Sequence, residues 1–230
     1  MQTYCPNPDC GKLLDLDIET MDKRSHFQGI CPHCLVPASF RSQEALAAIE
    51  KEYGKKLSTG NLKGGPELPE DVRPSLCVLV EDVRSLWNVG SIFRTADGAG
   101  FQAIYLSGIT GSPPRKEIAK VSLGAEDTVP WQYHANPLAV IKDLSARGIL
   151  IVGLEVSQSS VLLSQALETD LLSTPLCLVV GNEVSGLSPQ VMHFCDRTCH
   201  LPMAGMKESL NVAVAFGVAA YALSGKFLSP

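Results

Sequence analysis

Short apolar runs alternate along most of the chain with segments of helical periodicity. Helical patterns lie in NVGSIFRTADGAG, in PLAVIKDLSARG and from about Glu208 to Leu223, and Ser188 followed by Pro189 predicts a further helix start. The apolar runs have the length of buried strands: LCVLV at 76–80, AIYLS at 103–107, ILIVGLE at 149–155, LCLVV at 176–180 and, more weakly, RTCHLP. This alternation predicts an α/β domain with a largely parallel sheet.

The pattern is different before residue 75. Residues 1–40 are rich in cysteine, and the following RSQEALAAIEKEYGKK has the apolar spacing of a short amphipathic helix. Residues 55–74 are dense in Gly, Pro and charge, as interdomain linkers are. We therefore expect an N-terminal module over 1–54, a linker over 55–74 and a second domain over 75–230.

Composition limits the class of protein. The 230 residues, 45% of them hydrophobic, are enough for one core and a small accessory module. The N-terminus MQTYCPNPDCGK lacks the apolar stretch of a secretory signal, and the longest apolar run, at 210–223, is too short for a membrane span, so we expect a cytoplasmic protein. A net charge of −5 means that a nucleic-acid partner would need a local basic patch.

Four of the eight cysteines form two close pairs, Cys5 with Cys10 and Cys31 with Cys34. Four thiolates at this spacing suit a closed tetrahedral zinc site; a disulfide or metal-free thiols are the alternatives, and a reducing cytosol disfavours the disulfide. A closed site does no chemistry, so the module is expected to serve recognition. The remaining cysteines lie among apolar residues and are expected to be buried thiols: Cys77, Cys177, Cys195 and Cys199.

Gly98, Gly100 and Ala103 match a dinucleotide-binding fingerprint superficially. That fingerprint needs a strand before it and a helix after it, whereas here a helical pattern precedes and the run AIYLS follows. We interpret these residues as a helix C-terminus that turns into a strand.

Three other segments resemble the signature motifs of the SpoU (TrmH) family of RNA ribose 2′-O-methyltransferases. They are N-x-G-x-x-x-R-T-A within 79–101, G-x-E-x-x-G-L within 178–188 and P-M-x-G-x-x-x-S-L-N-V within 200–223, and KVSLGAEDTVPW resembles a family stretch between the first two. The resemblance runs from about Leu76 to Leu223. It implies a parallel α/β SPOUT fold with a trefoil knot, a homodimer, S-adenosylmethionine as cofactor, and tRNA or rRNA as substrate.

The resemblance also implies which residues bind the cofactor. They are Leu154, Gly181, Leu201, Met203, Ser209 and Leu210, with Glu155 closing the pocket. A glycine at the end of the strand LCLVV would let a ligand approach the backbone, although ordinary turn formation also explains it.

Arg94 is the candidate for chemistry. Arginine is permanently cationic and a weak base, so the resemblance implies that it acts with the phosphate of the target, which a planar guanidinium binds well. Asn88 and Asn211 are expected to orient Arg94 and the ribose, and Asn211 would need partners if buried in its helix. Glu183 is expected to anchor its loop or pair with a cation, a capping role being the alternative.

Three cations, Arg115, Lys116 and Lys120, could supply the basic patch, or simply form a solvated surface. His134, His193 and His200 have neither a nucleophile partner nor metal spacing, so structural roles are expected. Two alternative functions remain: a base-directed methyltransferase of the same fold, and a non-catalytic zinc-ribbon RNA-binding protein.

Overall fold

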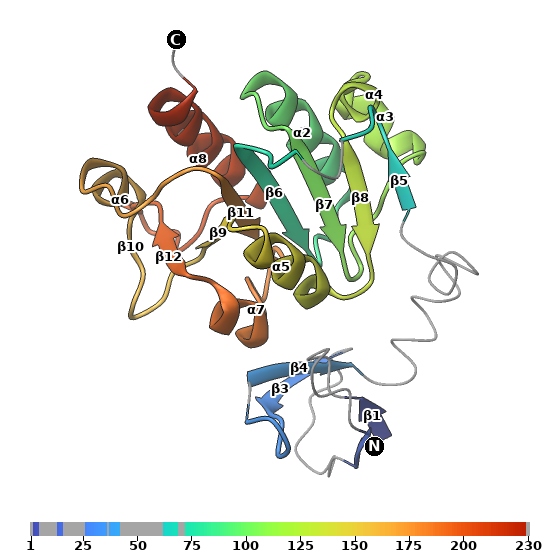
Figure 1. Cartoon of the computed structure of the whole chain (residues 1–230), viewed down its shortest axis with the longest axis vertical. Coiled ribbons are helices and arrows are strands. Elements are labelled where there is room, and N and C mark those ends of the chain that lie inside the picture. Colours follow the sequence, from blue (N-terminus) through green and yellow to red (C-terminus); the bar gives the residue numbers. More distant parts are fainter. Residues whose placement is uncertain are drawn as a thin grey trace.

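An eight-stranded sheet forms the centre of the protein in a computed structural model that describes residues 2–4, 13–15, 26–35, 37–41, 62–68 and 72–228 (Figure 1). The strand order is β10 (Val161–Leu162), β12 (Arg197–His200), β9 (Leu150–Leu154), β11 (Leu176–Val180), β6 (Leu76–Glu81), β7 (Ala103–Ser107), β8 (Trp131–His134) and β5 (Leu62–Gly64). All neighbours are parallel except β5, which runs antiparallel to β8. The predicted largely parallel α/β sheet is confirmed.

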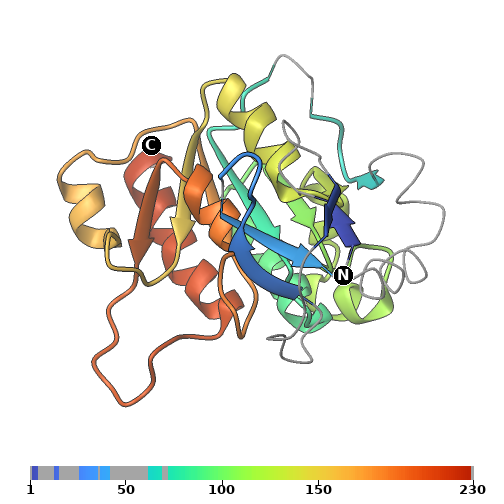
Figure 2. The ribbon, with the colours of Figure 1, turned by 90° about the horizontal axis from the view of Figure 1, so that it is seen from below.

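Helices cover both faces of the sheet (Figures 1 and 2). The first face carries α2 (Leu86–Gly98), α6 (Leu163–Glu168) and α8 (Val212–Phe227), and the second carries α5 (Pro137–Ala146) and α7 (Pro189–Phe194). Alternate residues of β6 enter the two cores: Val78 packs with Phe93 and Phe216 on the first face, whereas Leu79 packs with Ile141 on the second. Two short helices, α3 (Lys116–Ser122) and α4 (Ala125–Thr128), lie beside α2.

The predicted strands are all present, and the described eight-stranded sheet contains three more. β8 alternates apolar and polar residues, and β10 has only two residues, so neither forms an apolar run of strand length. β5 lies inside the stretch expected to be a linker, where Leu62 pairs with Tyr133 at the edge of the sheet. The helix expected over 41–56 lies outside the described residues. Cys77, Cys177 and Cys199 are buried as expected, and Cys195 is half-buried.

The start of α8 and the end of α2 determine where the residues of the first and third motif segments lie. α8 begins at Val212, four residues later than predicted, because the Asn211 side chain accepts hydrogen bonds from Ala213 and Val214 and caps the helix. The residues before it, 201–211, form an irregular loop instead. α2 ends at Gly98, and Gly100 turns the chain into β7 with φ +73°, which confirms the interpretation of that glycine pair.

The N-terminal residues that the structure describes form two antiparallel hairpins, β1 (Gln2–Tyr4) with β2 (Leu13–Asp15) and β3 (His26–Ile30) with β4 (Pro37–Arg41). The CPHC turn joins β3 to β4, and the Leu35 N–H donates to the Cys31 carbonyl at 2.9 Å. Cys31 is buried and Cys34 half-buried, while Cys5 and Cys10 lie outside the described residues. No helix in the described part of the chain is long and apolar enough to cross a membrane.

Candidate functional site

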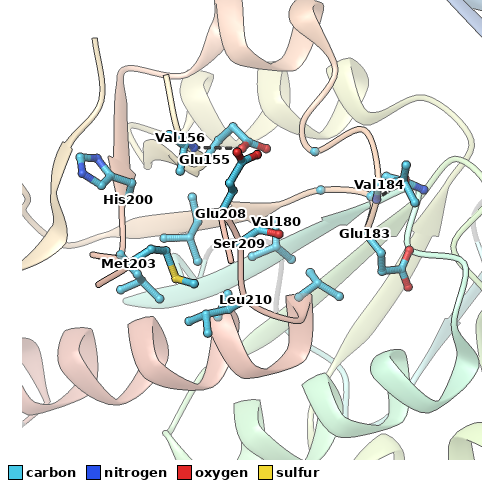
Figure 3. Close-up of a pocket in the computed structure, with 17 residues that line it drawn as sticks. Glu155, Val156, Val180, Glu183, Val184, His200, Met203, Glu208, Ser209 and Leu210 are labelled. Atoms are coloured by element: carbon cyan, nitrogen blue, oxygen red, sulfur yellow. Dashed lines mark hydrogen bonds between the residues drawn. The ribbon is translucent and has the colours of Figure 1, made fainter. Parts of the chain in front are cut away.

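A pocket opens at the carboxyl ends of β9, β11 and β12 (Figure 3). The loop after each strand contributes to it, and the first turn of α8 closes it. Ligand sites of parallel α/β sheets lie at this edge, since the loops there converge from several strands. The structure brings all six residues expected to bind a cofactor around this pocket: Leu154, Gly181, Leu201, Met203, Ser209 and Leu210.

The loop after β11 folds back tightly on itself. Asn182 and Gly186 exchange two backbone hydrogen bonds of 3.0 Å, and a Cβ at Gly181 would lie 2.4 Å from the backbone of Gly186 and Leu187. Only glycine fits at position 181, because any side chain would collide with this backbone. The loop geometry alone therefore requires the glycine, whether or not a ligand approaches it.

Asn182 is a residue of this site that the sequence interpretation missed. Its Oδ1 accepts from the backbone N–H groups of Val184 at 2.9 Å and Ser185 at 3.1 Å, and its Nδ2 donates to the Asp82 carbonyl at 2.7 Å. An asparagine directly after a strand and a glycine is a turn former whose side chain bonds locally, and this signal could have found it. The loop is thereby held rigid and tied to the end of β6.

Glu183 connects this loop to the start of α2. Its carboxylate accepts from the backbone N–H of Arg84 at 3.1 Å and of Ser85 at 3.0 Å, and from Asn88 Nδ2 at 3.0 Å. Burial alone would raise the pKa of Glu183, but these donors outweigh burial and hold the pKa below its usual value. The carboxylate thus anchors its loop at a helix N-terminus.

Asn88 continues the connection to the third motif. Its Oδ1 accepts from Asn211 Nδ2 at 3.2 Å, so Glu183, Asn88 and Asn211 form one polar network across three segments. Asn211 is exposed rather than buried, and its amide has the hydrogen-bonding partners that the sequence led us to expect, because it caps α8 and donates to Asn88.

Arg94 does not join this network. No hydrogen bond or ion pair links Arg94 to any residue in the described parts of the chain, and it does not line the pocket. Asn88 and Asn211 make their described hydrogen bonds to other residues, so their expected role in orienting Arg94 and the ribose stays a prediction. Six residues along a helix turn the side chain by about 600°, which places Arg94 on a different side of α2 from Asn88.

Arg94 instead borders an exposed apolar face. We define this apolar face by Trp87 on α2 and by Val214, Val218 and Tyr221 on α8, whose exposed fractions are 54%, 52%, 51% and 60%. Trp87 lies seven residues before Arg94 and therefore on the same side of α2. α2 and α8 pack together, and the Tyr221 hydroxyl lies over Gly98 at the end of α2.

The other predicted residues lie away from the pocket, with one exception. Lys116 and Lys120 are exposed one turn apart on α3, and Arg115 is the half-buried residue before that helix. His134 and His193 lie outside the pocket, but His200 lines it and its Nδ1 lies 3.0 Å from Ser160 Oγ.

Among the residues that the structure describes, no three His, Cys, Asp or Glu side chains lie close enough together to hold a metal.

Comparisons with known proteins point to one family. The family model described as "SpoU rRNA Methylase family" matches residues 75–221. A 23S rRNA (guanosine-2'-O-)-methyltransferase RlmB of Ralstonia nicotianae is 32% identical over 192 residues, which cover 80% of this chain and 74% of that protein. A tRNA (guanosine(18)-2'-O)-methyltransferase of Aquifex aeolicus is 31% identical over 160 residues, covering 70% of this chain and 74% of that protein.

A solved structure is similar over a comparable range. The crystal structure of an AdoMet-bound rRNA methyltransferase from Sinorhizobium meliloti has a TM-score of 0.61 and 27% identity. The match covers 84% of this chain and 65% of that chain.

Proposed function

The chain belongs to the SpoU rRNA methylase family, and from this premise we propose that it transfers a methyl group from S-adenosylmethionine to a ribose 2′-hydroxyl of tRNA or rRNA. The observation that carries the proposal is the convergence of six separately predicted cofactor residues on one pocket at the carboxyl edge of the sheet. The loops that form this pocket lie inside the segment that the family model matches.

The residues of the pocket fit this cofactor. Leu154, Leu201 and Leu210 offer apolar surface to an adenine ring, and the backbone beside Gly181 offers hydrogen-bonding groups. The bound cofactor would supply an electrophilic methyl group on a sulfonium. Rate enhancement then comes mainly from positioning the 2′-oxygen and from electrostatics.

Arg94 is the proposed catalytic residue, acting on the phosphate and the 2′-hydroxyl of the target nucleotide. It stands outside the pocket of its own chain but beside the apolar face. A second copy packed on this face would bring Arg94 of the partner subunit toward the pocket, because Val212 and Ala215 of α8 line the pocket while Val214 and Val218 belong to the face. We therefore propose a homodimer whose active site draws on both subunits.

The polar network has a positioning role in this proposal. Glu183, Asn88 and Asn211 hold the loop after β11 and the starts of α2 and α8 in one arrangement. The cations Arg115, Lys116 and Lys120 extend the proposed RNA path along α3, which packs against α2. Their charges supply the local attraction to phosphates that the net charge of −5 does not.

Three further features are proposed from the sequence and the resemblance. The loops 181–187 and 201–211 take part in a trefoil knot. The chain divides near residues 54 and 74 into a module, a connecting segment and the methyltransferase domain, and the connecting segment adds β5 to the sheet of that domain. Cys5, Cys10, Cys31 and Cys34 bind one zinc ion, and the CPHC turn with its Leu35 to Cys31 hydrogen bond is compatible with a metal knuckle.

Methyl transfer to defined RNA tests the proposal. The purified chain is incubated with labelled S-adenosylmethionine and with unmodified tRNA or rRNA, and the products are digested to nucleosides. We expect label in 2′-O-methylated ribose. Label in a methylated base would replace the proposal with a base-directed activity, and cofactor binding without transfer to either RNA would favour the non-catalytic alternative.

A further inference from the structure

The proposed cofactor pocket is strongly acidic. Three of the described residues that line it are glutamates, Glu155, Glu183 and Glu208, and none is a lysine or arginine. An acidic lining attracts cations and repels anions, and the effect grows where the surrounding protein excludes water. The charge of the lining therefore constrains which ligands this pocket prefers.

Two of the three carboxylates already serve the fold. Glu183 accepts its hydrogen bonds at the start of α2. Glu155 accepts from the backbone N–H of Leu187 at 2.9 Å and of Val156 at 2.9 Å, so it ties the end of β9 to the loop after β11. These bonds fix the Glu155 carboxylate in the pocket wall but leave its negative charge without a cation of the protein beside it in the lining.

In the part that the structure describes, Glu208 makes no comparable hydrogen bond that would stabilise the fold. It lies in the irregular loop before α8, and no hydrogen bond or ion pair joins it to another residue of the described chain. Figure 3 shows its side chain pointing toward that of Glu155 in the pocket. Two carboxylates directed at one space repel each other, and a bound cation relieves that repulsion.

We propose that Glu208, together with Glu155, makes this pocket select the cationic sulfonium cofactor over its neutral thioether product. This inference rests on the proposed function. In methyl transfer the sulfur–methyl bond breaks with its electron pair left on sulfur, a carbon–oxygen bond forms at the ribose 2′-oxygen, and the hydroxyl proton passes to water. Sulfur thereby changes from positively charged to neutral, so the acidic pair loses its partner and the product is released more readily.

Binding measurements on one variant test the selection. Calorimetry gives the dissociation constants of S-adenosylmethionine, S-adenosylhomocysteine and sinefungin, an analogue with an ammonium group near the position of the sulfonium. In Glu208→Gln we expect the preference for S-adenosylmethionine over S-adenosylhomocysteine to fall roughly threefold to fivefold, as for removal of one exposed charge partner. Sinefungin should weaken in parallel with S-adenosylmethionine, and added salt should narrow the preference of the wild type.

Glu168→Gln is the matched control, because Glu168 is exposed on α6 outside the pocket. It should leave all three dissociation constants unchanged, and circular dichroism should show that both variants fold. Equal weakening of all three ligands by Glu208→Gln, or no change in any, overturns the inference while the proposed function stands. Failure of the wild type to bind any of the three would instead refute the cofactor assignment itself.

Discussion

Arg94 is exposed and makes no hydrogen bond or ion pair with another described residue, so its replacement removes little from the folded state. We expect Arg94→Ala to change the free energy of unfolding by no more than about 0.5 kcal/mol. Single-turnover methylation should slow by about 10² or more, with cofactor affinity nearly unchanged. Arg94→Lys should keep some RNA affinity yet recover little rate, because lysine lacks the planar fork. Near-normal turnover in the alanine variant would remove Arg94 from the chemistry.

Glu183 makes stability depend on pH in the acidic range. Its pKa in the folded chain lies below the usual 4.5, so its stabilising contribution is present above pH 4.5 and is lost as the pH falls through the folded value. Thermal unfolding should show Glu183→Gln less stable than the wild type near neutrality, with this difference in stability shrinking as the pH falls below 4.5. Glu168→Gln controls for the loss of one exposed carboxylate. A difference that grows in acid would contradict this assignment.

At the scale of elements, the approach of α2 to α3 depends on one glycine. A Cβ at Gly90 would lie 2.7 Å from the Ile118 carbonyl oxygen and 2.9 Å from Val121 Cβ. Gly90→Ala should therefore destabilise the fold by about 1–3 kcal/mol through overpacking. Gly225→Ala on α8 is the control, because its Cβ would meet nothing within 4 Å, and it should be neutral or stabilising by up to about 1 kcal/mol. Denaturant unfolding gives the change in free energy of unfolding for each variant. Equal changes in the two variants would refute the role of Gly90 in helix packing.

The turn between β3 and β4 presents two of the proposed zinc ligands, Cys31 and Cys34. Metal analysis of the purified chain should find one zinc ion per chain, and Cys34→Ser should lower that content because a four-thiolate site loses one ligand. Cys195→Ser, which changes a half-buried cysteine of the other domain, should leave it unaltered. A folded wild type without zinc would exclude the site.

The sequence predicted the helices and strands better than it predicted the tertiary contacts between them. LCVLV and LCLVV are recognisable because they are buried on both faces, whereas β5 at the sheet edge and β8 beside it carry no continuous apolar run. The six pocket residues were predicted from motifs. The bond from Asn88 to Glu183, 95 residues apart, was not, because such a contact depends on tertiary folding rather than on local pattern.

At the scale of the whole molecule, the apolar face predicts self-association. Light scattering at micromolar concentration should give the mass of a dimer. Val218→Glu should weaken association about tenfold or more, because a carboxylate buried in an interface lacks a partner. Leu171→Glu alters an exposed apolar residue after α6, away from the face, and should leave the dimer intact. A wild-type monomer that still methylates RNA would refute the two-subunit site.

The network of Glu183, Asn88 and Asn211 spans from a pocket loop to the starts of the two helices that carry the apolar face. A ligand that orders that loop would also restrict α2 and α8, so occupation of the pocket and association of two copies in the proposed homodimer would be coupled. In the proposed homodimer, thermodynamic linkage would make the effect reciprocal: cofactor would strengthen the dimer by the same factor by which dimerisation would strengthen cofactor binding. The two pockets of such a dimer would then be coupled through the hydrogen bonds that join the pocket loop to the starts of α2 and α8.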